Sequence, residues 1–172
     1  MRRFAITIFL LLLVGFVGYV MTNLPHATSV APGDTAPALT LENTKGQKIS
    51  LSDLQGKIVM INFWATWCPP CIEEMPSMQR LYDAMQGDDF VMLAINTEEN
   101  GRSVVPEFLN KTSYTFPVLY DDQGEVQKKY GVYKFPETFI INKDGTIAQR
   151  IIGSLDWSSS KAIAYLKDLS KG

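Results

Sequence analysis

The only two cysteines of this 172-residue chain, Cys68 and Cys71, lie three positions apart, directly after an apolar run over residues 58–63. A dithiol at this spacing can close into a small disulfide ring and reopen with little movement of the backbone. The apolar run is typical of a strand, which would leave the pair at the edge of a sheet and at the start of a helix. The N-terminal N–H groups of a helix favour a thiolate. The pattern therefore indicates a site for thiol–disulfide exchange.

A cysteine pair can also belong to a zinc site or form a structural disulfide. Zinc takes about four ligands, and the chain offers no further cysteine and a single histidine, His26, in a stretch with the composition of a linker. A structural disulfide normally joins distant segments, whereas a ring this small removes little entropy from the unfolded chain. We therefore expect a redox role that requires no metal and no cofactor.

The length allows one ordinary domain preceded by a targeting segment. A hydrophobic content of 46% suits a globular core, and a net charge of −2 without a basic stripe argues against nucleic-acid binding. Residues 4–24 are uncharged and follow Arg2 and Arg3. About 20 helical residues cross the roughly 30 Å hydrocarbon layer, and arginines on the N-terminal side keep that end in the cytoplasm.

We expect residues 1–24 to be a single-pass signal-anchor in the bacterial cytoplasmic (inner) membrane, 25–34 a linker, and 35–172 a domain on the extracytoplasmic (periplasmic) side. A cleaved signal peptide is the alternative, but the small residues at 27–31 lie well past the apolar core. In either case the cysteines face an oxidising compartment.

The exported part alternates expected strands and helices. The strands are predicted at residues 38–41, 48–51, 58–64, 90–95, 116–119, 138–142 and 146–152. The helices are predicted at residues 68–85, 103–111, 124–130 and 157–170. This order describes an α/β sheet with an antiparallel edge, and such sheets carry their sites at the strand ends, where Cys68 falls.

The segment 63–71, with Pro76 five residues after the second cysteine, resembles the thioredoxin superfamily. The residues 73–76, and an insertion between the second central strand and segment 135–138, narrow this to the membrane-tethered TlpA, ResA and CcmG (DsbE) group of bacterial thiol–disulfide proteins. The resemblance covers roughly residues 33–167. It implies a thioredoxin-like α/β fold, with a central mixed sheet flanked by helices, an N-terminal hairpin and that insertion.

Each cysteine has an expected role. Cys68, at the helix start, should be the attacking thiol, and Cys71, one turn on and facing inward, the resolving thiol with the higher pKa. Trp67 is expected to shield the ring and touch the substrate. The resemblance implies that Phe135 and Pro136 form a cis-proline loop, which packs beside the disulfide and offers backbone groups to an extended substrate.

The resolving thiol needs a base. Thioredoxin has a buried aspartate six residues before its first cysteine, but that position here is Asn62, which cannot ionise. The resemblance places a glutamate after the second central strand at Glu99, with Glu98 one residue out of register, so we expect Glu99 to be the proton-relay acid. The alternative is that both are solvated loop residues.

Three other residues near the motif or the C-terminus are expected to have ordinary roles. Glu73 and Glu74 are predicted to be acidic residues of a first helical turn, and Trp157 to be a packing residue.

The resemblance implies a protein-disulfide reductase that acts on apocytochrome c during cytochrome c maturation and is re-reduced by a transmembrane donor of the DsbD or CcdA type. Two prolines and no histidine between the cysteines disfavour a strong oxidant. A broader reductase for other exported proteins is one alternative. A copper metallochaperone of the Sco type is another, but it would use a histidine, and the chain has none after His26.

Overall fold

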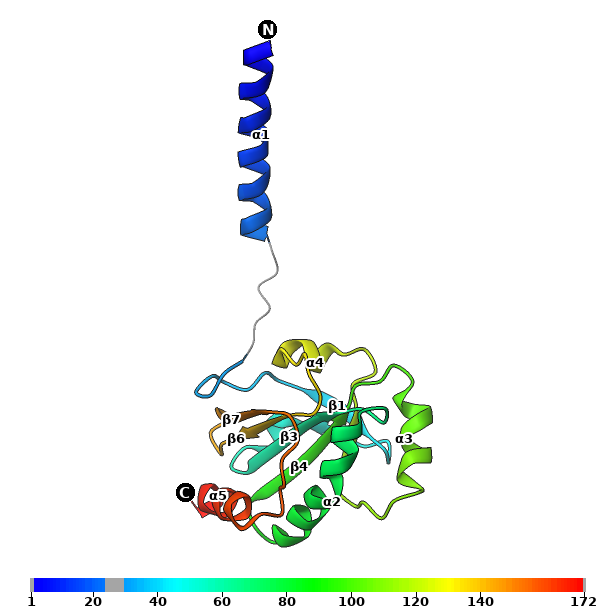
Figure 1. Cartoon of the computed structure of the whole chain (residues 1–172). Helices are drawn as coiled ribbons and strands as arrows, with labels where there is room; N and C mark the ends of the chain where they lie inside the picture. Colours follow the sequence, from blue (N-terminus) through cyan, green and yellow to red (C-terminus); the bar gives the residue numbers. More distant parts are fainter. Residues whose placement is uncertain (1, 24–29, 172) are drawn as a thin grey trace.

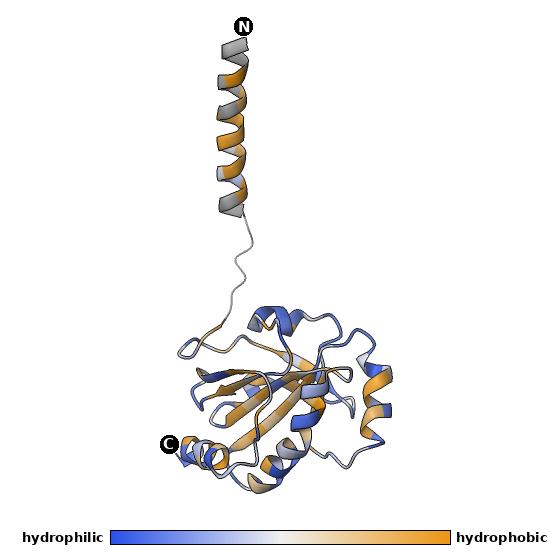
Figure 2. Cartoon of the chain, viewed as in Figure 1, coloured by the Kyte–Doolittle hydropathy of each residue, from blue (hydrophilic) through white to orange (hydrophobic). Residues whose placement is uncertain are grey.

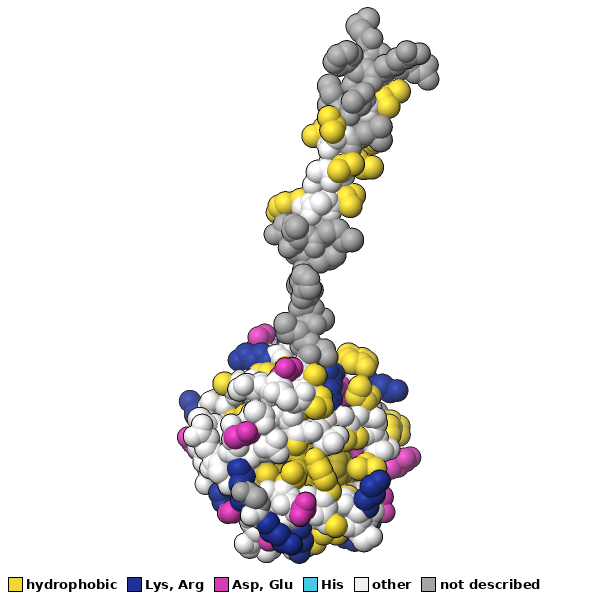
Figure 3. All heavy atoms as spheres, turned by 90° about the vertical axis from the view of Figure 1, so that its left-hand side faces the viewer, with side chains coloured by type: hydrophobic (Ala, Val, Ile, Leu, Met, Phe, Trp, Pro, Cys, Tyr) yellow, Lys and Arg dark blue, Asp and Glu magenta, His cyan; other side chains and the backbone are white. Residues whose placement is uncertain are grey.

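The computed structural model describes residues 2–23 and 30–171 (Figure 1). Helix α1 spans Arg2–Asn23, and the apolar side chains described in it are exposed (Figure 3). Across the described residues, no helix is long and apolar enough to cross a membrane. Residues 25–29 of the expected linker, residues 25–34, lie outside the described residues. The membrane anchor and the domain boundaries stay predictions.

A single seven-stranded sheet forms the centre of the domain, in the order β2-β1-β5-β4-β3-β6-β7. The strands are β1 Thr40–Asn43, β2 Lys48–Ser50, β3 Ile58–Trp64, β4 Phe90–Asn96, β5 Val118–Tyr120, β6 Glu137–Ile141 and β7 Ile147–Ile152. Strands β3, β4 and β5 are parallel, and the remaining pairs are antiparallel. The expected mixed α/β sheet, with a hairpin at each edge, is confirmed.

Four helices and one short 3₁₀ turn accompany the sheet. They are η1 Leu51–Leu54, α2 Pro69–Ala84, α3 Gly101–Leu109, α4 Glu125–Tyr130 and α5 Ser160–Lys171. The segment with α3, β5 and α4 lies between β4 and β6, as the expected insertion does.

The core has two halves, one on each face of the sheet. Successive residues of a strand point to opposite faces, and accordingly Ile58 and Met60 of β3 belong to the cluster that includes buried residues of α2, α3 and α5. Val59 and Ile61 belong to the cluster that includes residues of α4. All seven residues of β3 are buried, which explains why all of them except Asn62 are apolar. Figure 2 shows this concentration of hydrophobic residues in the central strands.

Candidate active site

The two cysteines form a disulfide at the N-terminus of α2. The central strand β3 ends four residues before Cys68, which fixes the pair at the edge of the sheet. Cys68 is the N-cap residue of α2, and its Sγ accepts a hydrogen bond of 3.3 Å from the N–H of Cys71. Cys68 is 4% exposed and Cys71 fully buried. Cys68 is thus the more accessible sulfur, and a backbone donor for its thiolate is in place.

An aromatic rim borders the pair. Trp67, which is 66% exposed, meets the half-buried Phe135 in an edge-to-face contact with ring centroids 6.0 Å apart. The Phe135–Pro136 peptide bond is cis, as expected. Because Glu137 pairs with Phe63 across β6 and β3, Pro136 lies beside the end of the strand that leads to the cysteines. The structure therefore brings the expected substrate-binding residues together at this edge.

Glu98 is buried and fixes the loop that leads into the cysteine motif. Its carboxylate accepts hydrogen bonds from the backbone N–H of Thr66 at 2.7 Å, from the Thr66 hydroxyl at 2.9 Å and from the side-chain amide of Asn96 at 2.8 Å. Thr66 lies two residues before Cys68. The role that these contacts support is to hold the loop between β3 and α2.

Glu99, the expected relay acid, is exposed. It lines a polar pocket beside α4, together with Asp122 and Gln123. This placement lends no support to a proton-relay role for Glu99, which stays a prediction. Of the two glutamates, Glu98 is the one directed at the cysteine loop.

Glu74 is the carboxylate that the sequence-based interpretation missed. It follows Cys71 by one turn of α2, and both side chains lie on the buried face of the helix, with Glu74 only 4% exposed. The expectation that Glu73 and Glu74 are both ordinary acidic residues of a first helical turn is wrong for Glu74, which is buried. Glu73 is exposed. The three-residue spacing from Cys71 was the available signal, because residues at that spacing share a helix face.

Three uncharged donors hold the Glu74 carboxylate. Oε1 accepts a hydrogen bond of 2.8 Å from Nδ2 of Asn62. Oε2 accepts one of 3.2 Å from the backbone N–H of Leu155 and one of 3.1 Å from Nε1 of Trp157. Burial raises the pKa of Glu74 above its ordinary value, and the three hydrogen bonds oppose that shift. A raised pKa brings the carboxyl group closer to the pKa of a thiol, which favours proton exchange between the two.

Asn62 can serve both protonation states of Glu74. Its Nδ2 also donates to Oγ1 of Thr138 at 2.9 Å, while its Oδ1 is buried without a hydrogen-bond partner. If Glu74 takes up a proton, rotation of the Asn62 amide would present Oδ1 as the acceptor for it. The structure therefore places a buried acid, Glu74, in contact with position 62, which itself cannot ionise.

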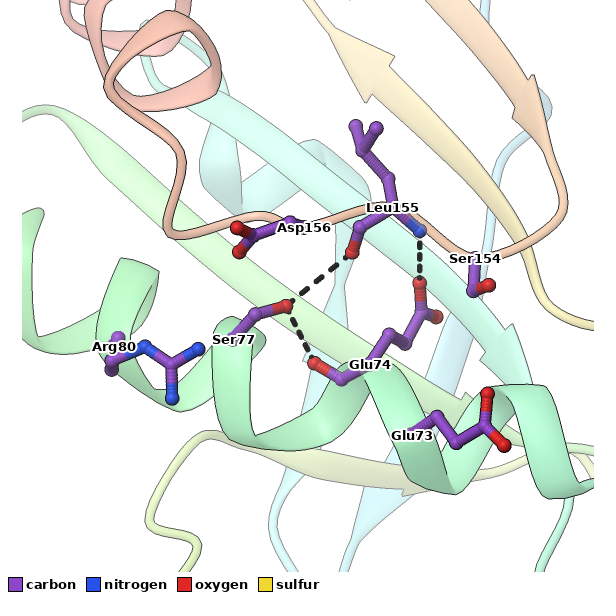
Figure 4. A pocket seen from close by; sticks show the side chains of 7 residues that line it. All are labelled: Glu73, Glu74, Ser77, Arg80, Ser154, Leu155 and Asp156. Carbon is purple, nitrogen blue, oxygen red and sulfur yellow. Dashed lines mark hydrogen bonds between the residues drawn. The ribbon is translucent and has the colours of Figure 1, made fainter.

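A pocket of about 260 Å³ opens beside Glu74, between α2 and the segment 154–156 (Figure 4). Glu73, Ser77 and Arg80 line its α2 side. The pocket offers a route by which a proton on Glu74 can reach solvent. Over the residues that the structure describes, no group of three or more His, Cys, Asp or Glu side chains could hold a metal ion.

Comparisons with known proteins agree with this chemistry. Residues 32–150 match the AhpC/TSA family. The chain is 41% identical over 151 residues to the thiol-disulfide oxidoreductase ResA of Geobacillus kaustophilus (strain HTA426). The aligned residues cover 87% of this chain and 86% of the relative. It is 36% identical over 156 residues to ResA of Bacillus subtilis (strain 168), with 90% and 87% covered. A crystal structure of a putative thiol:disulfide interchange protein DsbE from Chlorobium tepidum matches with a TM-score of 0.71 at 28% identity, covering 82% of this chain and 96% of that one.

Proposed function

Since this chain belongs to the AhpC/TSA family of thioredoxin-like proteins and is a thiol–disulfide oxidoreductase, we propose that it works in the reducing direction, as a protein-disulfide reductase. The observation that carries the direction is the buried Glu74 carboxylate, one helical turn after Cys71 and held by uncharged donors alone. A nearby negative charge disfavours thiolates. A strong oxidant, by contrast, stabilises its reduced form.

The reaction takes its two electrons from the Cys68–Cys71 dithiol. The Cys68 thiolate attacks one sulfur of the substrate disulfide, which breaks that bond, forms a Cys68–substrate disulfide and releases a substrate thiolate that takes up a proton. Cys71 then loses its proton and attacks Sγ of Cys68. This forms the intramolecular disulfide seen here and releases the second substrate thiolate. The substrate is reduced and the enzyme oxidised.

Glu74 is the proposed acceptor of the Cys71 proton. The two side chains lie on one buried helix face, and the raised pKa of the carboxyl group brings it closer to that of a thiol. The pocket beside Glu74 lets the proton leave. This assignment takes the relay role from Glu99, whose carboxylate is exposed.

We further propose that the substrates are apocytochrome c chains, whose Cys-x-x-Cys-His sites must be reduced before haem attachment. The support is the resemblance of Pro136-Glu137-Thr138 to the CcmG-type cis-proline segment. A transmembrane dithiol donor of the DsbD or CcdA type would restore the reduced enzyme. A broader role on other exported proteins is the competing proposal.

The proposed location is the extracytoplasmic side of the bacterial cytoplasmic membrane, with residues 1–24 as the anchor. The uncharged sequence of residues 4–24 and the exposed apolar side chains described in α1 support it. Carbonate extraction of membranes, followed by N-terminal sequencing, tests it. We expect the protein to stay in the pellet with Arg2 and Arg3 intact, and a mature N-terminus near Thr28 or Pro32 would refute the anchor.

A trapping experiment tests the substrate. In cells that express the Cys71→Ala variant, partners that stay disulfide-linked to Cys68 are identified by mass spectrometry. We expect apocytochrome c among them, and a Cys68→Ala, Cys71→Ala double variant as the control should capture nothing. Capture of exported proteins without Cys-x-x-Cys-His sites would favour the broader reductase. Stable copper binding by the dithiol would favour the metallochaperone.

A further inference from the structure

We propose that Trp157 is a positioning residue for the exchange reaction, because its indole N–H holds the Glu74 carboxylate in the orientation and charge state that accept the Cys71 proton. The proposal rests on the proposed role of Glu74 and deepens it. Trp157 lies 86 positions after Cys71 in the sequence, in the segment Gly153–Trp157 between β7 and α5, which we call the clasp segment.

The two oxygens of Glu74 are held from different parts of the fold. Oε1 is held by Asn62 of the central strand β3. Oε2 is held only from the clasp segment, by Nε1 of Trp157 and the backbone N–H of Leu155. Figure 4 shows the Leu155 contact, with the segment passing over the face of α2 that carries Glu74. The clasp segment thus supplies the hydrogen-bond donors to Oε2, and the central sheet supplies the donor to Oε1.

The indole of Trp157 cannot easily turn away. Trp157 is 3% exposed and belongs to the core cluster on this face of the sheet. Its backbone N–H donates to Oγ of the buried Ser77 at 3.1 Å, and the Ser77 hydroxyl donates to the carbonyl oxygen of Glu74 at 2.7 Å. Ser77 therefore ties the clasp segment to the same turn of α2 that carries the carboxylate.

The other end of the clasp segment is tied to the cis-proline loop. The N–H of Gly153 donates to the carbonyl oxygen of Pro136 at 2.8 Å. Gly153 has φ of +95°, a backbone conformation that residues other than glycine adopt at a cost. The segment is therefore held at both ends, which fixes the two donors that Glu74 uses.

The charged groups around Glu74 are few. Glu73 and Arg80 on α2, and Asp156 in the clasp segment, line the same pocket. Lys161 of α5 lines a second pocket, which Leu155 and Trp157 also line. Asn62, which contacts Glu74 from the sheet, is uncharged, and so is Thr138, the other hydrogen-bond partner of Asn62. None of these sheet contacts can replace the donor that Trp157 supplies to Oε2.

Loss of the indole N–H of Trp157 should change the pKa of Glu74 in one direction. The N–H stabilises the charged carboxylate and so lowers its pKa, whereas burial raises it. Removing the N–H should therefore raise the pKa of Glu74 further. At a given pH within its titration range, a larger fraction of Glu74 would then already carry a proton and could not accept one from Cys71. A hydrogen bond to a charged group corresponds to a shift of about one pH unit, and hence to a roughly tenfold slower step on the acid side of the pH profile.

The test follows both steps of the reaction with Ellman's reagent as the disulfide. Attack by Cys68 releases one coloured thiolate, and attack by Cys71 on the mixed disulfide releases the second. For Trp157→Phe we expect an unchanged first phase, and a second phase whose acid limb moves up by about one pH unit and whose rate recovers at higher pH. Trp64→Phe is the matched control, because Trp64 is equally buried but its Nε1 has no hydrogen-bond partner, and its profile should not move.

Two further variants keep the proposal open to refutation. A tryptophan analogue with sulfur in place of the indole N–H, placed at position 157, removes only the donor and should shift the profile as Trp157→Phe does. In a Glu74→Gln background, Trp157→Phe should shift nothing more. An unshifted profile with the analogue, or an equal shift in the Glu74→Gln background, would overturn the role of Trp157. If Glu74→Gln itself leaves the second phase unchanged, the proposed role of Glu74 fails instead.

Discussion

Nδ2 of Asn62 donates a hydrogen bond of 2.8 Å to Oε1 of Glu74, and so joins the central strand to α2 one turn beyond Cys71. Both side chains are buried. A carboxylate in such a place is unfavourable unless hydrogen bonds compensate for its lost hydration. The Asn62–Glu74 pair thus places a titratable, hydrogen-bonded carboxyl group one helical turn after the resolving cysteine.

Replacement of each cysteine in turn should affect the accumulation of mixed disulfides differently. Cys68 is the N-cap and the more accessible sulfur, whereas Cys71 is fully buried. We expect Cys71→Ser to accumulate mixed disulfides with a protein substrate, and Cys68→Ser to form almost none. Non-reducing gel electrophoresis after incubation with an oxidised substrate measures this. Equal trapping by the two variants would contradict the assignment.

Glu74→Gln should slow the attack by Cys71 about tenfold or more near neutral pH, because the step loses its proton acceptor. The fold should persist, since rotation of the Asn62 amide can satisfy a glutamine side chain. Stopped-flow measurement of mixed-disulfide resolution tests this, with Glu73→Gln as the exposed control on the same helix. A Glu99→Gln variant that is slowed while Glu74→Gln is not would return the relay role to Glu99.

Glu74 should also make stability depend on pH. Its carboxyl titrates near 4.5 in the unfolded chain and, because of burial, at a higher pH in the folded protein. Between those values the folded state binds more protons, so the free energy of unfolding falls as pH rises through this window. We expect this fall in the free energy of unfolding in the oxidised wild type, and we expect it to be absent from Glu74→Gln. Urea-unfolding midpoints at a series of pH values measure it, and parallel curves for the two proteins would rule it out.

Glu98→Ala should destabilise the protein by about 1–3 kcal/mol, because the N–H and hydroxyl of Thr66 lose their acceptor. Glu99→Ala, at the exposed neighbouring position, should change the free energy of unfolding by no more than about 0.5 kcal/mol. Denaturant unfolding of both variants gives the comparison. Similar small effects would mean that Glu98 does not hold the cysteine loop.

The sequence predicts the parts of this fold that depend on local pattern. The strand expected over residues 58–64 coincides with β3, because burial on both faces favours a run that is apolar at every position but Asn62. The helix expected from residue 68 is α2 with Cys68 as its cap. The expected hairpin at residues 38–41 and 48–51 forms, but its first strand begins at Thr40.

The features that the sequence does not predict depend on contacts between distant segments. Two donors to Glu74, from Leu155 and Trp157, come from more than 80 positions further along the chain, and no spacing rule connects them. Trp157 packs in the core as expected, but its N–H has this further partner. The sequence does not tell which of Glu98 and Glu99 points inward, because β4 ends at Asn96 and both glutamates lie in the loop after it. The structure buries Glu98 and exposes Glu99.

The reduction potential of the Cys68–Cys71 pair tests the central claim, reducing function, most directly. Equilibration with glutathione or dithiothreitol buffers, followed by thiol alkylation and mass analysis, gives its value. With a buried carboxylate one helical turn after Cys71 and two prolines in the first turn of α2, we predict a potential near that of thioredoxin, about −270 mV. A value near that of DsbA, about −120 mV, would contradict the account and make the protein an oxidant.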